Sequence, residues 1–177
     1  FAFDGAVMIT ASHLPFNRNG YKFFDKDGGL EHDDIAKVLT TASKLQTADA
    51  DLSTVEKVDS LSVYCEFLQD KIKKSICAEH YEKPLEGLHI VVDAGNGAGG
   101  FFVEKVLVPL GADTTGSQFL EPDGYFPNHI PNPENKDAME SIRQAVLNHQ
   151  ADLGIIFDTD VDRMSAVLPS GEEVNRD

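Results

Sequence analysis

Short apolar runs alternate with polar stretches that contain glycine and proline along the 177 residues. Residues 6–9, 88–93 and 153–157 are typical of buried strands, because each run is short and ends in turn-forming residues. Helices are indicated in residues 99–108 and 134–149, where apolar residues recur every three or four positions. The alternation of strands and helices after residue 88 predicts a largely parallel sheet covered by helices.

The first half of the chain carries a different pattern. A second strand is expected near residues 21–24, and residues 35–45 place their apolar positions on one helical face. The acidic stretch 46–53 has the composition of a loop, and the following helix should end near residue 76. We interpret residues 82–87, which contain a proline, as a linker between two domains.

We therefore expect an α/β protein with two domains, residues 1–83 and residues 84–177. The second domain should contain a further strand at residues 112–116 and a strand-like segment at residues 164–168. In such a fold the reactive groups are expected at the carboxyl ends of the strands.

A polar cluster closes the first apolar run. Residues 10–15 read Thr-Ala-Ser-His-Leu-Pro, and Asn19 and Lys22 follow shortly after. A serine placed where a strand enters such a loop is exposed, and the neighbouring His13 and Lys22 can move protons or stabilise negative charge. The alternative is a serine that only caps a turn.

A second cluster follows the strand at residues 153–157. Asp158, Asp160 and Asp162 fall on one side of an extended chain, because side chains alternate there with a period of two. Three neighbouring carboxylates repel one another unless a cation lies among them, and oxygen ligands of this kind suit Mg²⁺. The alternative is an acidic turn on an acidic surface.

Two other functions are alternatives to a Mg²⁺ site at the aspartates. A calcium-binding EF-hand loop needs glycine and glutamate where this chain has Arg163 and Pro169, so that motif is excluded. A phosphatase of the haloacid-dehalogenase type also follows a hydrophobic strand with Asp-x-Asp, and Asp158 would then be its nucleophile. That alternative stays open.

Together the two clusters resemble the α-D-phosphohexomutase family, which contains phosphoglucomutase and phosphomannomutase. Its serine loop reads Thr-Ala-Ser-His-Asn-Pro with a later Asn-Gly-x-Lys, and its metal loop reads Asp-Gly-Asp-x-Asp-Arg. The matching positions here are Thr10, Ala11, Ser12, His13, Pro15, Asn19, Gly20, Lys22, Asp158, Asp160, Asp162 and Arg163. Residues 91–97 and 123–133 also look like the family's second domain.

The resemblance implies two three-layer α/β/α domains with mixed or mostly parallel sheets. Against the family pattern the first domain is truncated to residues 1–83, residues 84–177 form the metal-binding domain, and domains 3 and 4 are absent. We therefore expect this chain to be a fragment that is inactive when isolated.

The resemblance also implies an isomerase of the phosphotransferase type, which interconverts hexose 1-phosphate and hexose 6-phosphate. A phosphoryl group on Ser12 would pass through a hexose 1,6-bisphosphate. Catalysis is then assigned to Ser12, His13 and Lys22. One Mg²⁺ would be held by Asp158, Asp160, Asp162 and the phosphoryl oxygen of Ser12. Contacts to substrate or phosphoryl group are assigned to Thr10, Asn19 and Arg163.

Two positions depart from the family pattern. Leu14 stands where the family usually has asparagine, and Thr159 stands where it usually has glycine. Leu14 removes an amide beside the reactive serine, and Thr159 puts a β-branched residue into a turn. These departures keep a third hypothesis open, a catalytically inactive paralogue that binds sugar phosphates.

Composition limits the partners. The net charge of −15 comes without a basic stripe, so we expect a hexose phosphate and no nucleic acid. No apolar run reaches eighteen residues, so we expect no membrane partner. Cys65 and Cys77 have neither metal-binding nor redox spacing, which favours an intracellular compartment, the cytoplasm first and a plastid as the alternative. The preferred hexose and the oligomeric state stay open.

Two further features receive structural interpretations. Residues 95–100 fit the glycine pattern of dinucleotide-binding turns, but we interpret them as a tight turn between a strand and a helix. His129, in a proline-rich loop, is interpreted as a turn or surface histidine rather than a ligand.

Overall fold

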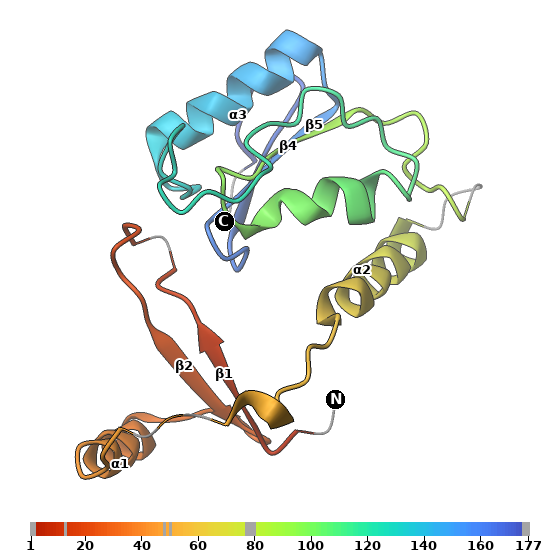
Figure 1. The fold of residues 1–177 in the computed structure, drawn as a ribbon. Helices are drawn as coiled ribbons and strands as arrows, with labels where there is room; N and C mark the ends of the chain where they lie inside the picture. Colours follow the sequence, from red (N-terminus) through yellow and green to blue (C-terminus); the bar gives the residue numbers. More distant parts are fainter. Residues whose placement is uncertain (1–2, 13, 48, 50, 77–80, 175–177) are drawn as a thin grey trace. The chain divides into compact units, whose positions relative to one another are not determined.

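The computed structural model describes residues 3–12, 14–47, 49, 51–76 and 81–174. The chain divides into two compact units, which we treat separately (Figure 1). Unit 1 comprises residues 1–11 and 17–58, and unit 2 comprises residues 12–16 and 59–177.

Unit 1 is built on an antiparallel sheet. Strand β1 (Gly5–Ile9) pairs with β2 (Tyr21–Asp25), and β2 pairs with the short β3 (Gly28–Gly29). Helix α1 (His32–Ala42) and the 3₁₀ turn η1 (Leu52–Thr54) follow. The strands expected at residues 6–9 and 21–24 are therefore confirmed, and the helix expected from the apolar positions at residues 35–45 begins at His32 and ends at Ala42.

The apolar side chains of unit 1 remain accessible. None of the residues described in this unit is fully buried, and β1 exposes 53% of Val7 and 63% of Ile9. Helix α1 likewise buries none of its residues. Within the described part of unit 1, hydrogen bonds between strands hold the sheet together, and an apolar core contributes little.

Unit 2 contains a mixed sheet. Strands β4 (Ile90–Asp93) and β5 (Leu153–Phe157) are parallel, and β6 (Met164–Val167) pairs with β5 in the antiparallel direction. Because β4 and β5 are parallel, their carboxyl ends lie at the same edge of the sheet. The residues that follow the two strands, including Asp158, are therefore brought to that edge.

Helices cover both faces of this sheet (Figure 1). Helix α3 (Lys136–His149) packs on one face, where it buries Val146 against the strands. The other face is covered by the segment containing η2 (Ala98–Gly100) and the π-helical turn η3 (Val103–Leu107), and α2 (Ser60–Ile76) packs on η3. The expected α/β architecture with a mixed sheet is confirmed.

The two faces have separate apolar cores. The core under α3 contains Val91, Ile142 and Ile156, and the core on the opposite face contains Val92 and Val106. Successive residues of β4 thus point into different cores, as the alternation of side chains along a strand requires. This explains why β4 is apolar at every position from 90 to 92.

Three expectations need adjustment. The prediction of a strand at residues 112–116 is wrong. The chain there runs beside β4 but makes only isolated bridges, because a turn from Thr114 to Ser117 interrupts it. The helix predicted at 99–108 begins as a 3₁₀ turn and widens into η3. The helix predicted at 134–149 starts at Lys136, where Asn135 caps it.

The contacts of helix α2 place it in unit 2. The domain boundary expected between residues 83 and 84 stays a prediction.

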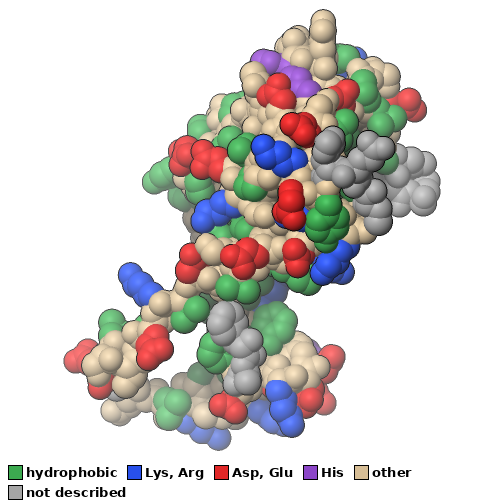
Figure 2. Space-filling model, turned by 90° about the vertical axis from the view of Figure 1, so that its right-hand side faces the viewer, with side chains coloured by type: hydrophobic (Ala, Val, Ile, Leu, Met, Phe, Trp, Pro, Cys, Tyr) green, Lys and Arg blue, Asp and Glu red, His purple; other side chains and the backbone are tan. Residues whose placement is uncertain are grey.

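Charged side chains are dispersed on the face shown in Figure 2, where acidic groups lie among basic and apolar ones. Among the described residues, no helix has both the length and the apolar character needed to cross a membrane.

The packing of α3 on β5 predicts the effect of a substitution at Gly154. A Cβ at this position would collide with the side chain of Val146 and lie 3.0 Å from Cγ1 of Ile142. We expect Gly154→Ala to lower the free energy of unfolding by about 1–3 kcal/mol, because the helix must move away from the sheet. Urea denaturation of the chain measures this quantity.

Gly124→Ala is the matched control, since no atom lies within 4 Å of the added methyl group. It should change the free energy of unfolding by less than about 0.5 kcal/mol. Equal stability of the two variants would contradict the close packing of α3.

Candidate functional site

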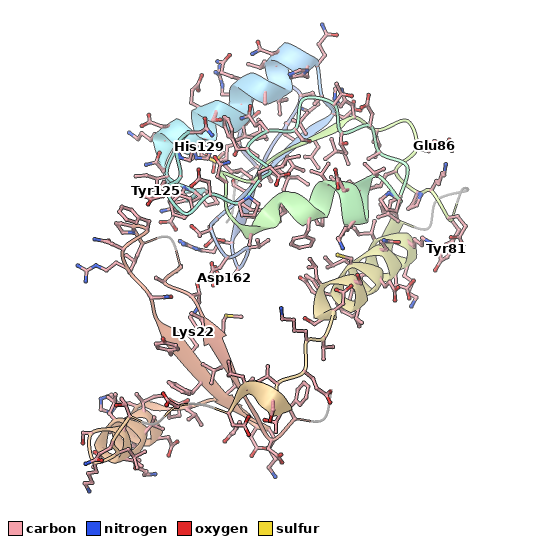
Figure 3. All side chains as sticks on the ribbon, viewed as in Figure 1. Lys22, Tyr81, Glu86, Tyr125, His129 and Asp162 are labelled. Carbon is pink, nitrogen blue, oxygen red and sulfur yellow. The ribbon has the colours of Figure 1, made fainter. Side chains whose placement is uncertain are left out.

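Three carboxylates gather in the loop after β5. One oxygen from each of Asp158, Asp160 and Asp162 can be chosen so that all three lie within 4.8 Å of one another. Asp158 is completely buried and Asp160 is half-buried, whereas Asp162, labelled in Figure 3, is exposed. We call residues 158–163 the aspartate loop. It presents a cluster of negative charge that runs from the sheet edge to the surface.

Arg163 closes the aspartate loop on itself. Its backbone N–H donates to Oδ1 of Asp158 at 3.1 Å, and its Nε donates to Oδ2 at 3.0 Å. The backbone N–H of Asp158 in turn donates to the carbonyl of Arg163 at 3.1 Å. Nε of Arg163 also lies 3.7 Å from Oδ1 of Asp162. One guanidinium therefore compensates part of the charge of two carboxylates.

The environment of Asp158 opposes its ionisation. Burial raises the pKa of this carboxyl above its usual range, and the neighbouring Asp162 and Asp160 raise it further, although the hydrogen bonds from Arg163 act in the opposite direction. A bound cation would relieve this repulsion, because it favours the charged form of all three groups. The donor set consists of oxygens only, which fits a hard divalent cation such as Mg²⁺ or Mn²⁺.

The glycine-rich turn at residues 95–98 packs against the aspartate loop. The backbone N–H of Ala98 donates to the carbonyl of Thr159 at 2.9 Å. A Cβ at Gly97 would lie only 2.7 Å from the same carbonyl oxygen and 2.9 Å from Cα of Thr159. Glycine at position 97 is therefore required for this close approach of two backbones. The glycine pattern of residues 95–100 thus has a structural explanation here.

A buried polar network, which we call the Asp93 network, lies behind this turn. Asp93 is completely buried, and its carboxylate accepts hydrogen bonds from Gln118, Ser141 and the backbone N–H of Gly95. Nε2 of His129 lies 2.9 Å and 3.0 Å from the two carboxylate oxygens. Four groups thus compensate one buried charge, as such burial requires.

His129 was interpreted as a turn or surface histidine rather than a ligand, and the surface location is wrong. Its side chain is only 5% exposed and pairs with Asp93, 36 residues earlier. The sequence signals were weak: Asp93 ends an apolar strand, and His129 lies among prolines. The pairing depends on how the loop from 119 to 131 folds back over the glycine-rich turn, which no local pattern reveals.

The serine loop connects β1 to β2. Its two ends are held together by the hydrogen bond from the N–H of Thr10 to the carbonyl of Gly20, at 3.1 Å. A Cβ at Gly20 would lie 2.7 Å from the carbonyl oxygen of Thr10, so the close approach needs glycine there. Asn19 accepts a hydrogen bond from the N–H of Gly20. Thr10 and Asn19 therefore shape the base of the loop.

Ser12 has a left-handed backbone conformation, with φ of 54°. Such a conformation is uncommon for residues other than glycine and is often found at functional sites. Ser12 and the following residues to Phe16 are part of unit 2. Within that unit, Nη2 of Arg163 donates to Oγ of Ser12 at 3.4 Å. Arg163 thus contacts both the serine hydroxyl and Asp158.

The other residues assigned from sequence have simpler surroundings. Lys22 lies on β2 opposite Met8, and its side chain is exposed (Figure 3). His13 lies outside the described residues. The catalytic, metal-binding and substrate-binding assignments of the sequence analysis stay predictions.

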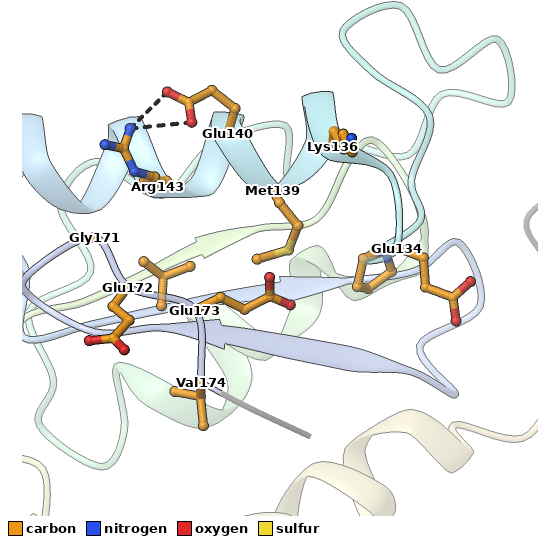
Figure 4. Close-up of a pocket in the computed structure, with 11 residues that line it drawn as sticks. Glu134, Lys136, Met139, Glu140, Arg143, Gly171, Glu172, Glu173 and Val174 are labelled. Carbon is orange, nitrogen blue, oxygen red and sulfur yellow. Dashed lines mark hydrogen bonds and ion pairs between the residues drawn. The ribbon is translucent and has the colours of Figure 1, made fainter. Parts of the chain in front are cut away.

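A groove of about 730 Å³ lies between α3 and the segment that follows β6 (Figure 4). Two basic residues and four glutamates are among its lining residues: Lys136 and Arg143, with Glu134, Glu140, Glu172 and Glu173. Arg143 is already paired with Glu140. This excess of carboxylates disfavours an anionic ligand, so the groove is a poorer candidate for a sugar phosphate than the aspartate loop with Arg163.

An apolar pocket of about 310 Å³ adjoins the aspartate loop. It is lined by aromatic and aliphatic side chains of α2, of residues 101–102 and of β5, and Asp162 and Arg163 lie at it. The pocket offers Arg163 an apolar surface on one side, which strengthens the guanidinium's interactions with anions by lowering the local dielectric constant.

Comparison with known proteins yields two family matches. The model of "Phosphoglucomutase/phosphomannomutase, alpha/beta/alpha domain II" matches residues 62–171, and the model of "Phosphoglucomutase/phosphomannomutase, alpha/beta/alpha domain I" matches residues 1–49. The first match includes α2 and the aspartate loop, and the second includes the serine loop.

Individual relatives agree with these matches. A phosphoglucomutase of Neisseria gonorrhoeae is 34% identical over 173 residues, which are 97% of this chain and 35% of the relative. A phosphomannomutase/phosphoglucomutase of Pseudomonas putida is also 34% identical, over 97% of this chain and 34% of the relative. The chain thus spans about a third of the length of these curated relatives.

Solved structures show the same fold. A phosphoglucomutase/phosphomannomutase family protein from Burkholderia thailandensis superposes with a TM-score of 0.77 at 26% identity, covering 97% of this chain and 35% of that protein. A putative phosphomannomutase from Thermus thermophilus superposes with a TM-score of 0.69 at 23% identity, covering 98% and 38%.

The ion pair between His129 and Asp93 predicts a pH dependence of stability. Burial, the largest influence, lowers the pKa of His129, but the hydrogen bond and charge of Asp93 and the carbonyl of Ile130 outweigh it, so the net shift is upward. A histidine whose folded pKa lies above its unfolded value of about 6.5 contributes stability fully below that value and loses it as pH rises through the folded pKa.

In the unsubstituted chain we therefore expect the free energy of unfolding to fall as the pH rises above about 6.5. The variant His129→Gln should lack this pH-dependent decrease. Urea midpoints measured between about pH 6 and pH 9 give the two profiles. His32→Gln is the control, because the side chain of His32 is 97% exposed. Parallel profiles for the unsubstituted chain and His129→Gln would contradict the prediction.

Proposed function

We propose, because the chain belongs to the phosphoglucomutase/phosphomannomutase family, that the whole protein interconverts hexose 1-phosphate and hexose 6-phosphate. The reaction proceeds through a phosphoryl group on Ser12 and a hexose 1,6-bisphosphate. This chain supplies the serine loop and the aspartate loop of that protein.

One observation carries the proposal. Arg163 donates to Asp158 in the carboxylate cluster and to the hydroxyl of Ser12. The guanidinium can therefore bind a phosphoryl group on Ser12 while it holds the aspartate loop closed. A residue with this double contact is expected where an anionic ester meets a group of metal-binding carboxylates.

The transfer requires little covalent chemistry from the protein. A hydroxyl oxygen of the sugar attacks the phosphorus atom, and the bond between phosphorus and Oγ of Ser12 breaks while Oγ takes up a proton from a neighbouring acid or from water. The proton of the sugar hydroxyl passes to a base. Lys22 and His13 are the candidates for this proton. In the second half of the reaction the other phosphoryl group of the bisphosphate returns to Ser12, which restores the starting enzyme.

The carboxylates of Asp158, Asp160 and Asp162 would hold one Mg²⁺, together with an oxygen of the phosphorylated Ser12. When bound, the cation supplies positive charge that stabilises the transferring phosphoryl group. The protein's own part is to keep three carboxylates close together and to orient Arg163. The closed loop formed by the hydrogen bonds of Arg163 to Asp158 does both.

The family matches favour this function over the aspartyl phosphatase considered from the sequence. The hypothesis of an inactive paralogue is based on the departures from the family pattern at Leu14 and Thr159. The backbone of Thr159 does not adopt a left-handed conformation, so this position does not demand glycine. The structure thus removes the steric argument against activity at one of the two departures.

The proposal predicts the result of removing the serine hydroxyl. In the whole protein, Ser12→Ala should lower the rate of interconversion of the two hexose phosphates by at least about three orders of magnitude. The reason is that no residue can then carry the phosphoryl group. A coupled assay measures the rate. Intact-mass analysis should show a phosphate adduct that is lost in the same variant.

Ser75→Ala, on the exposed side of α2, is the matched control and should keep both the rate and the adduct. An aspartyl phosphatase would behave differently, releasing free phosphate, losing activity in Asp158→Asn and ignoring Ser12→Ala. Normal interconversion in Ser12→Ala would end the proposal. Binding of hexose phosphate without turnover would favour the inactive paralogue.

A further inference from the structure

The Asp93 network contains buried titratable groups for which the proposed reaction has no use. Asp93 is completely buried at the end of β4 and receives four kinds of donor. Burying a carboxylate is costly unless it is paired and hydrogen-bonded. A core residue at this position would avoid that cost. The network is therefore expected to contribute geometry rather than stability alone.

His129 is the titratable partner of Asp93 in the network. Its Nε2 faces the carboxylate of Asp93, and its Nδ1 lies 3.1 Å from the carbonyl oxygen of Ile130. Both ring nitrogens thus face acceptors, and only an imidazolium can donate from both. The edge-to-face contact with Phe119 fixes the plane of the ring, with 5.5 Å between the ring centroids. His129 is held in one orientation from three sides.

The Asp93 network continues into the glycine-rich turn. Oδ1 of Asp93 accepts the N–H of Gly95 at 2.9 Å. A Cβ on Gly95 would lie 3.0 Å from Cε1 of His129, so the imidazole packs directly on the turn. Asn96 is fixed from outside by the amide of Asn128 and by the carbonyl of Phe119. The turn is therefore clamped between Asp93 and the loop that carries His129.

The glycine-rich turn also contacts the aspartate loop through its backbone. The N–H of Ala98 donates to the carbonyl of Thr159, and Gly97 leaves room for that backbone. The hydroxyl of Thr159 also lies 3.5 Å from the carbonyl of Pro131, two residues after His129. Thr159 separates Asp158 from Asp160, so a shift of Thr159 changes the distance between their carboxylates.

We infer that His129 is a positioning residue for the aspartate loop: by holding the turn from Asp93 to Ala98, it sets the placement of Thr159 and thereby the spacing of the flanking carboxylates. The inference rests on the proposed metal site, and it concerns the geometry of the ligands rather than the chemistry. Residues that orient metal ligands from behind commonly change metal affinity about 10–100-fold when substituted.

The test measures Mn²⁺ binding rather than turnover. Mn²⁺ is titrated into the chain, and the free ion is followed by electron paramagnetic resonance; the site-specific component is the one that Asp160→Asn abolishes. His129→Ala should weaken this component at least about tenfold. His129→Gln, which keeps one N–H donor for Asp93, should lose less affinity than His129→Ala.

Val146→Ala is the matched control for loss of stability, because Val146 is a buried residue of α3 that packs in the apolar core with Ile142 and Ile156. All variants are compared at a temperature where circular dichroism shows them folded. Unchanged Mn²⁺ affinity in Val146→Ala supports the inference. An equal loss in Val146→Ala, or affinity within about twofold of the unsubstituted chain in His129→Ala, overturns it.

The test also separates this inference from the proposed function. If the unsubstituted chain shows no component that depends on Asp160, the proposed metal site fails and the inference fails with it. If that component is present but indifferent to His129, the proposed metal site stands and only the positioning role is lost.

Discussion

Two buried carboxylates at one edge of a sheet determine the organisation of unit 2. Asp93 ends β4, Asp158 follows β5, and both are completely buried. A buried carboxylate must be compensated by hydrogen bonds or opposite charge. The two solutions differ. Asp93 receives donors from several elements together with His129, whereas Asp158 relies on Arg163 and has two further carboxylates beside it. The first arrangement is electrostatically complete, and the second gains from a cation.

Glycines connect the two arrangements. The turn after β4 lies against the aspartate loop because Gly97 carries no side chain, and the same turn is held by Asp93 through the N–H of Gly95. The serine loop uses the same device, since Gly20 allows the ends of β1 and β2 to approach at Thr10. In each case two backbones pack more closely than any side chain permits. The glycines therefore fix the positions of these polar loops through close contacts between backbones.

The sequence predicted the features that depend on local patterns. β5 occupies the residues expected from its apolar run, and α3, the helix before it, follows the periodic spacing of its apolar residues. The carboxylate cluster was expected from the side-chain alternation of an extended chain, but the loop is a turn in which the N–H of Val161 donates to the carbonyl of Asp158, and this turn brings the three carboxylates together. The burial of His129 could not be predicted, since it depends on a contact with Asp93, 36 residues earlier, and the turn from Thr114 to Ser117 that interrupts the segment at 112–116 was also missed. Periodicity carries no information about such contacts.

The aspartate loop also shows where backbone strain is located. Val161 has φ of 65°, a conformation that is unfavourable for a β-branched residue. It lies between Asp160 and Asp162, and its N–H donates to the carbonyl of Asp158. Strain of this kind persists only where the surroundings impose it, and here the hydrogen bonds of Arg163 to Asp158 close the loop around Val161. The chain thus folds the loop into a shape that brings like charges together. That shape costs free energy in the absence of a cation, and a cation bound as we propose would offset this cost, so metal affinity and loop closure would then be two aspects of the same equilibrium.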